Sequence, residues 1–164
     1  MAFRLRKDAE KWFSELQGRT PFKTMWDMYY FCVMAGFASG RKTDPVSGGR
    51  SAPEFVDYVV DDYRPAQRLL IGLLIVSELK KLDISFAEKK DVQNVIQSIV
   101  DPQTQTSLKP EGQRLMNAYA SGGYDFLAEK RPTKPYRTVE FLRDYNQLLS
   151  EFLTDNPFWP VARN

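Results

Sequence analysis

Apolar residues recur at helical spacing along most of this chain, which predicts a mainly α protein: a compact bundle of about six helices. The clearest stripe lies near the C-terminal end, where Phe141, Tyr145, Leu148 and Phe152 follow one another on one face. The expected helices cover residues 8–17, 24–39, 65–82, 85–99, 110–121 and 138–153, with a short helical piece at 124–129. The run at 69–76 is apolar on nearly every side, so we expect the third of these helices to be the buried centre.

The first 40 residues form a strand-helix-helix element in this interpretation. Residues 2–6 alternate, with Ala2, Arg4 and Arg6 on one side and Phe3 and Leu5 on the other, as in a short, half-buried strand. Helix 8–17 ends at Gly18, because glycine tolerates the left-handed conformation of a helix end. The next helix begins at Thr24, with Asp27 adding negative charge to its first turn, and ends at Gly40.

Turn-forming residues divide the rest of the chain. Glycine and proline between residues 41 and 53 predict an exposed basic loop, and residues 54–62 suit either a strand or a helical turn. Gly122-Gly123 are expected to end the fifth helix. The sequence therefore predicts a single domain over 1–164: the element 1–40, the loop 41–53, a helical body 54–155 and an aromatic tail 156–164 that docks on the body.

The single cysteine, Cys32, rules out an intrachain disulfide and favours a reducing, cytoplasmic location, with Cys32 as a small buried side chain. The start of the chain lacks the apolar core of a signal peptide. Its longest apolar run, 69–76, falls well short of the roughly 20 residues that cross a bilayer. We therefore expect no membrane partner.

The chain contains no histidine, which excludes Ser-His-Asp and Cys-His catalysis and the common zinc sites. A phosphate-binding loop of the Walker type is also missing. These absences predict a non-enzymatic protein without cofactor or metal. One enzymatic alternative stays open, a magnesium nuclease. Glu78 and Lys80 would form the E-x-K part of a common nuclease motif. The upstream aspartate that this motif also requires would be Asp57, Asp61 or Asp62.

Charge is unevenly distributed. Residues 1–50 carry nine Lys/Arg and five Asp/Glu, whereas the remainder carries fourteen and sixteen, so the basic end predicts an anionic partner. A further basic set, with Arg137 and Tyr136 beside it, lies between two predicted helices. The residues expected to contact nucleic acid are Arg4, Arg6, Lys7, Lys23, Thr24, Arg41, Lys42, Arg50, Lys130, Arg131 and Lys134.

The order of strand, helix and helix resembles the ribbon-helix-helix arrangement of small DNA-binding proteins. That resemblance implies a homodimer in which two strands pair and their outward side chains enter the major groove. Here these side chains would be Ala2, Arg4 and Arg6, with arginine suited to bidentate contacts with guanine. Lys23 and Thr24 would meet a phosphate at the start of the second helix.

Two further blocks carry a second resemblance. Phe22-Lys23-Thr24-Met25 leads into Ala35-Gly36-Phe37-Ala38-Ser39-Gly40-Arg41, and Leu115-Met116-Asn117-Ala118-Tyr119-Ala120-Ser121-Gly122-Gly123 follows later. Together with the basic start Arg4-Leu5-Arg6-Lys7, this set resembles the small "associated protein 4" family of DNA phosphorothioation (Dnd) systems, over roughly residues 3–130. The resemblance implies a prokaryotic defence setting and a DNA-handling complex, and it transfers no catalytic residues.

The leading hypothesis is therefore an accessory DNA-binding or complex-bridging protein of a prokaryotic anti-phage DNA-modification or restriction system. Its expected partners are DNA, through the backbone, and other defence-system proteins. One alternative is a protein–protein adaptor without DNA contact, using aromatic side chains around Trp26, Tyr29, Tyr30 or Trp159. Another is a ribbon-helix-helix-like transcriptional regulator.

Overall fold

The structure is a computed structural model that describes residues 2–158. It is mainly helical, as the periodicity predicts, with 59% helix and 8% strand. Six α-helices occur in the described part of the chain, with a 3-10 helix η1 (Asp61–Ala66) before the third. They are α1 (Lys7–Trp12), α2 (Met25–Ser39), α3 (Gln67–Lys81), α4 (Lys89–Ile99), α5 (Pro110–Lys130) and α6 (Thr138–Asp155). The strands are β1 (Phe3–Arg4), β2 (Val46–Ser47), β3 (Arg50–Ser51) and β4 (Glu54–Val56).

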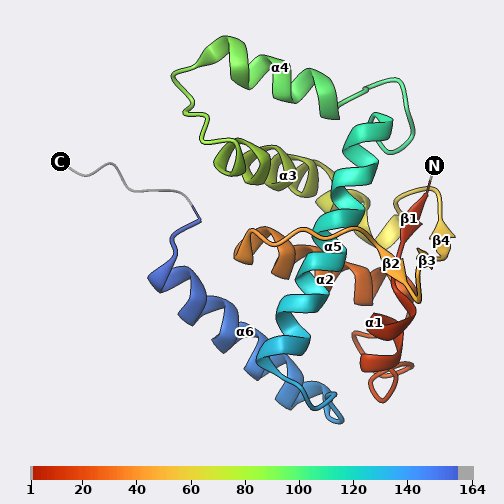
Figure 1. Cartoon of the computed structure of the whole chain (residues 1–164). Coiled ribbons are helices and arrows are strands. Elements are labelled where there is room, and N and C mark those ends of the chain that lie inside the picture. Colours follow the sequence, from red (N-terminus) through yellow and green to blue (C-terminus); the bar gives the residue numbers. More distant parts are fainter. Residues whose placement is uncertain (1, 159–164) are drawn as a thin grey trace.

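Helix α5 runs through the middle of the molecule, and α2 crosses it (Figure 1). The crossing is close because glycines stand where the two backbones meet. A Cβ at Gly36 would overlap the carbonyl oxygen of Tyr119, and a Cβ at Gly123 would overlap that of Cys32. Gly122-Gly123 were predicted to end the fifth helix, and this is wrong. The helix continues to Lys130. The two glycines lie inside it, where they allow α2 and the residues after α2 to approach its backbone closely.

Helix α3 is not the buried centre that its apolar run predicted. Leu70, Leu74 and Leu79 are buried, but Leu69 is 55% exposed, and α3 lies with α4 at one end of the molecule (Figure 1). The centre is α5, whose buried face includes the polar residues Gln113, Asn117 and Ser121. Asn117 is well satisfied there: its Oδ1 accepts from the Tyr29 hydroxyl at 2.9 Å, and its Nδ2 donates to the Ala2 carbonyl at 3.0 Å.

The predicted N-terminal strand exists, but its partner lies in the same chain. Strand β1 pairs antiparallel with β4, which aligns Phe3 with Val56 and Arg4 with Glu54. This pairing assigns residues 54–56 of the ambiguous segment to a strand, and η1 begins at Asp61. Within the predicted loop 41–53, β2 and β3 form a short hairpin. As predicted, Phe3 and Leu5 point into the core.

The local signals of the first 40 residues are largely confirmed. Thr24 precedes α2, and the Asp27 carboxylate accepts hydrogen bonds from the backbone N–H groups of Thr24 at 2.7 Å and Lys23 at 2.8 Å. Gly18 and Gly40 adopt positive φ values of 80° and 72°. Helix α1 is shorter than the predicted 8–17, ending at Trp12 and continuing as turns.

At the other end, the Lys80 ammonium donates to the Pro157 carbonyl at 3.0 Å. The remainder of the predicted aromatic tail, from Trp159 onward, lies outside the described residues. Among residues 2–158, none of the helices combines the length and apolarity that crossing a bilayer requires.

Candidate nucleic-acid interface

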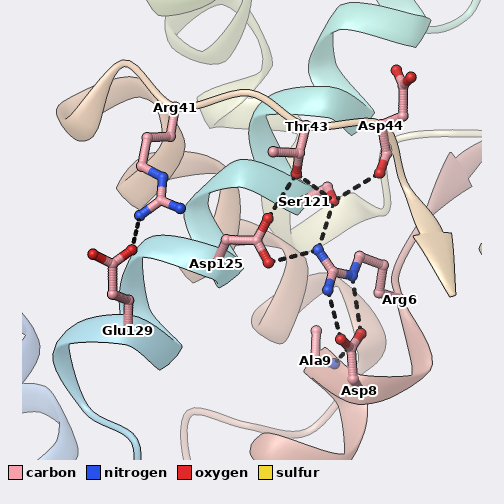
Figure 2. A network of polar contacts seen from close by, with 9 residues as sticks. All are labelled: Arg6, Asp8, Ala9, Arg41, Thr43, Asp44, Ser121, Asp125 and Glu129. Carbon is pink, nitrogen blue, oxygen red and sulfur yellow. Dashed lines mark hydrogen bonds and ion pairs between the residues drawn. The ribbon is translucent and has the colours of Figure 1, made fainter.

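The Arg6 guanidinium, predicted to reach DNA, lies in a network with residues of its own chain (Figure 2). Its Nη1 donates to Asp125 Oδ1 at 2.7 Å and to Ser121 Oγ at 3.2 Å. On the other edge, Nε and Nη2 donate to the two carboxylate oxygens of Asp8, at 3.0 and 2.6 Å. Only 15% of the Arg6 side chain is exposed. Arg6 therefore joins the start of α1 to α5 and does not project toward a partner.

The same network holds the segment that follows α2 (Figure 2). Thr43 Oγ1 donates to the second oxygen of Asp125 at 2.9 Å and lies 3.0 Å from Ser121 Oγ. Ser121 Oγ also lies 3.3 Å from the Asp44 carbonyl, to which it donates. Farther along α5, Arg41 pairs with Glu129. Since each of these side chains has a partner within the chain, the network holds three segments together: the start of α1, residues 41–44 and α5.

Lys42 is directed inward as well. Its ammonium lies 2.9 Å from Glu78 Oε1, and the Tyr119 hydroxyl donates to the same oxygen at 2.9 Å. Burial raises the pKa of Tyr119, and the neighbouring Glu78 raises it further, so this hydroxyl stays a donor. Glu78 thus binds Lys42 and Tyr119, while Lys80 binds Pro157. No cluster of three or more potential metal ligands occurs in the described part of the chain.

Arg4 is occupied in the same manner. Its guanidinium donates to the Ala52 carbonyl and to Glu54, both at 2.6 Å, and Ala2 beside it is buried. The side of β1 expected to enter a DNA groove is therefore covered by the protein itself. Other predicted contact residues are exposed at separate places on the surface: Lys7, Lys23, Thr24 and Arg50.

The aromatic surface predicted for a protein adaptor is mostly internal. Trp26 is 2% exposed and Tyr29 is fully buried, so these side chains cannot meet a partner, and Tyr30 is half-buried. The rings of Trp26 and Tyr29 pack on each other in the core, with their centroids 5.2 Å apart. Trp159 lies outside the described residues.

The basic residues of the segment 130–137 line an open cleft of about 380 Å³, here called the basic cleft. Lys130 ends α5, the segment 131–137 crosses to α6, and Trp12 and Phe141 close the floor. Four cations line it, from residues 130–137: Lys130, Arg131, Lys134 and Arg137. Tyr136, also in the lining, keeps 57% of its surface exposed.

The cations of the basic cleft are held loosely. Arg131 lies 3.3 Å from Asp144, Arg137 lies 3.5 Å from Glu140, and Lys134 lies 3.4 Å from Glu15. Exposed ion pairs of this kind contribute only about 0–1 kcal/mol each. The four cations face three carboxylates, Glu140 and Asp144 in the lining and Glu15 beside Lys134, so the site retains an excess of one positive charge. This is the place where basic residues chosen from the sequence converge and remain accessible.

Sequence reasoning identified Lys130, Arg131 and Lys134 and the neighbouring Arg137. It missed Trp12, because nothing in the sequence places α1 beside a segment more than a hundred residues later. Trp12 is held there by a hydrogen bond from its Nε1 to the Arg131 carbonyl, at 3.4 Å.

Comparison with protein-family models, with curated proteins and with solved structures found no match. The two blocks that carry the resemblance to Dnd-associated proteins have a structural role in this chain. Residues 35–41 and 115–123 face each other where α2 crosses α5, and their glycines permit the close approach described above.

Proposed function

We propose that this protein binds nucleic acid through the basic cleft, as an accessory protein of a prokaryotic DNA-modification or restriction system. The observation that carries the proposal is the convergence of Lys130, Arg131, Lys134 and Arg137 around an exposed tyrosine. The DNA partner is the one expected from the sequence, but the contact moves from the N-terminal strand to residues 130–137. The defence setting derives from the resemblance to Dnd-associated proteins.

Physical chemistry favours phosphate as the group bound there. Lysine and arginine neutralise phosphates without reading sequence, and the release of counterions supplies much of the free energy. Arg131, Lys134 and Arg137 lie 3.3–3.5 Å from exposed carboxylates, which a phosphate can replace at little cost. By contrast, a phosphate could reach Arg6 only by breaking its bonds to Asp8 and Asp125.

A second candidate function, bridging to a protein partner, is favoured by a different observation. Leu69, Leu82 and Ile96 on and beside α3 and α4 are exposed by 55%, 56% and 39%. Leu69 and Leu82 stand at opposite ends of α3 and Ile96 stands on α4, so the exposed apolar side chains are spread over this helix pair. Under this alternative, replacing Leu69 and Ile96 by serine would abolish co-purification with a neighbouring component, whereas charge changes in the basic cleft would not.

The test of the proposed function is fluorescence-anisotropy binding of labelled DNA at about 50–200 mM salt, where phosphate contacts reveal themselves. The variant Arg131→Gln/Arg137→Gln is compared with Lys89→Gln/Lys90→Gln, which removes the same charge from exposed positions of α4. We expect the first variant to weaken binding on the order of tenfold or more, since one hydrogen bond to a charged group contributes about 1.5–3 kcal/mol. Equal binding by the two variants would remove the basic cleft from the proposal.

A further inference from the structure

We infer that the basic cleft receives an unpaired nucleotide, so that the protein prefers single-stranded nucleic acid to duplex. This inference rests on the proposed function and specifies its ligand. It follows from three features of the cleft: its concave shape, the one aromatic ring exposed in its lining, and the position of its charges.

Shape separates the two ligands. A duplex is read by an element that projects from the protein into a groove. The element with that pattern, β1, lies against β4, and its Arg4 is bound to Glu54 at 2.6 Å. The basic cleft, in contrast, is a hollow of about 380 Å³ between the end of α5, residues 131–137 and the start of α6. A single splayed nucleotide can enter a hollow, whereas a base held in a duplex cannot.

The aromatic residues of the cleft have different roles. Trp12 and Phe141 are 7% and 5% exposed and pack edge to face at 5.9 Å, so they belong to the core. Tyr136 is more than half exposed, with the Lys134 ammonium 5.9 Å from its ring centre. An exposed ring next to cations is the arrangement on which unpaired bases stack in proteins that bind single strands. Paired bases hide their faces in the duplex and gain nothing from such a ring.

The charges surround this ring in sequence and in space. Arg137 follows Tyr136 directly and is 77% exposed, and Arg131 lies on the same cleft. Helix α6 starts immediately afterwards at Thr138, and Glu140 in its first turn is the exposed carboxylate that a phosphate would replace at Arg137. The site thus offers a stacking surface and phosphate contacts within one small hollow.

The experiment compares a labelled oligothymidylate with a duplex of equal strand length, using the full chain at about 100 mM salt. The variants are Tyr136→Ala, which removes the ring, and Tyr136→Phe, which keeps it. We expect wild type to bind the single strand more tightly. Tyr136→Ala should weaken that binding on the order of tenfold, the usual effect of losing one stacked base. Tyr136→Phe should match wild type, and duplex binding should change little in either variant.

Unlabelled heparin serves as a competitor with charge but no bases. The inference predicts that heparin displaces oligothymidylate more readily from Tyr136→Ala than from wild type. It is overturned if duplex and single strand bind wild type equally and Tyr136→Ala has no effect; salt-dependent binding through Arg131 and Arg137 would then leave the proposed function standing. Failure of wild type to bind either DNA at low salt would instead remove the proposed function itself.

Discussion

Gly123 of α5 lies so close to the carbonyl group of Cys32 in α2 that a Cβ at this position would overlap the carbonyl oxygen. The overlap is with backbone, which cannot rotate away as a side chain can. The spacing of α2 and α5 therefore depends on the absence of a methyl group here, as it does at Gly36.

Gly123→Ala should destabilise the protein by about 3 kcal/mol or more, because α2 and α5 must separate to admit the methyl group. Gly72→Ala is the matched control, since a Cβ at this α3 position meets nothing within 4 Å. It should stabilise the protein by about 0.5–1 kcal/mol, the usual gain for alanine over glycine inside a helix. Urea denaturation measures both. Similar midpoints for the two variants would contradict the close crossing.

Arg6→Ala should lower stability by about 2–4 kcal/mol without weakening DNA binding, when binding is measured where the variant is folded. The change leaves Asp125 with Thr43 but without its cationic partner, and it removes the hydrogen bonds of a mostly buried guanidinium. Arg114→Ala is a fair comparison, because Arg114 also lies 2.6 Å from a carboxylate, Glu111, but is 55% exposed. Its effect should stay within about 0.5 kcal/mol. A loss of DNA binding in a stably folded Arg6→Ala protein would restore Arg6 to the interface.

Stability should decline as the pH rises above about 10. Burial raises the pKa of five tyrosines, among them Tyr124, whose pKa is raised to about 12; the others are Tyr29, Tyr63, Tyr119 and Tyr145. Because these hydroxyls lose their protons more readily in the unfolded chain, the unfolded state binds fewer protons at high pH. Their contribution is complete below pH 10 and is lost as pH rises toward the folded pKa values.

Urea midpoints between pH 8 and pH 12 test this expectation. Tyr124→Phe keeps the ring beside Arg6 but cannot ionise, so its midpoint should fall less steeply than that of wild type. Parallel curves for the two proteins would show that Tyr124 does not titrate differently in the folded and unfolded chains.

The Cys32 thiol should be inert in the native protein. It is fully buried, and burial raises its pKa, so little reactive thiolate forms near neutral pH. A chromogenic disulfide reagent should therefore react in step with unfolding, quickly in urea and slowly without it. Rapid labelling of the folded protein would place Cys32 at an accessible position.

The sequence predicted a helix end correctly where a single residue determines it. Asp27 at the start of α2 and Gly40 at its end act as predicted, because each satisfies or relieves backbone groups within four residues of itself. Gly18 has the predicted left-handed conformation, but α1 already ends at Trp12. Phe3 and Leu5 were assigned to the core by simple alternation, and the structure confirms this.

The position of each helix in the fold could not be predicted from its own residues. Apolarity ranked the 65–82 helix as central, yet the central helix is α5, which buries Gln113, Asn117 and Ser121. Asn117 is tolerated because Tyr29 and Ala2 complete its hydrogen bonds, and both lie far away in sequence. Gly122 and Gly123 were interpreted as a helix end because the sequence does not show that α2 and the residues after it pack closely against them.

The candidate site likewise has one property that the sequence predicts and one that depends on the fold. The basic character of residues 130–137 is a property of the sequence, whereas the cleft exists because Trp12 and Phe141 pack together beneath it. Arg4 and Arg6 were equally basic in sequence. Their partners Glu54 and Asp125 lie 50 and 119 residues away, so their engagement within the fold could not be anticipated.

The hydrogen bonds that tie residues 2–8 to α5 span up to 119 positions of the chain. As the nascent polypeptide leaves the ribosome, β1 emerges long before Asn117, Ser121 and Asp125 have been synthesised. Phe3 and Leu5, both buried in the finished protein, must wait without a complete core until then. Strand β1 is therefore synthesised before the other strands but is among the last elements to complete its contacts. Its apolar side chains stay accessible to chaperones during that interval.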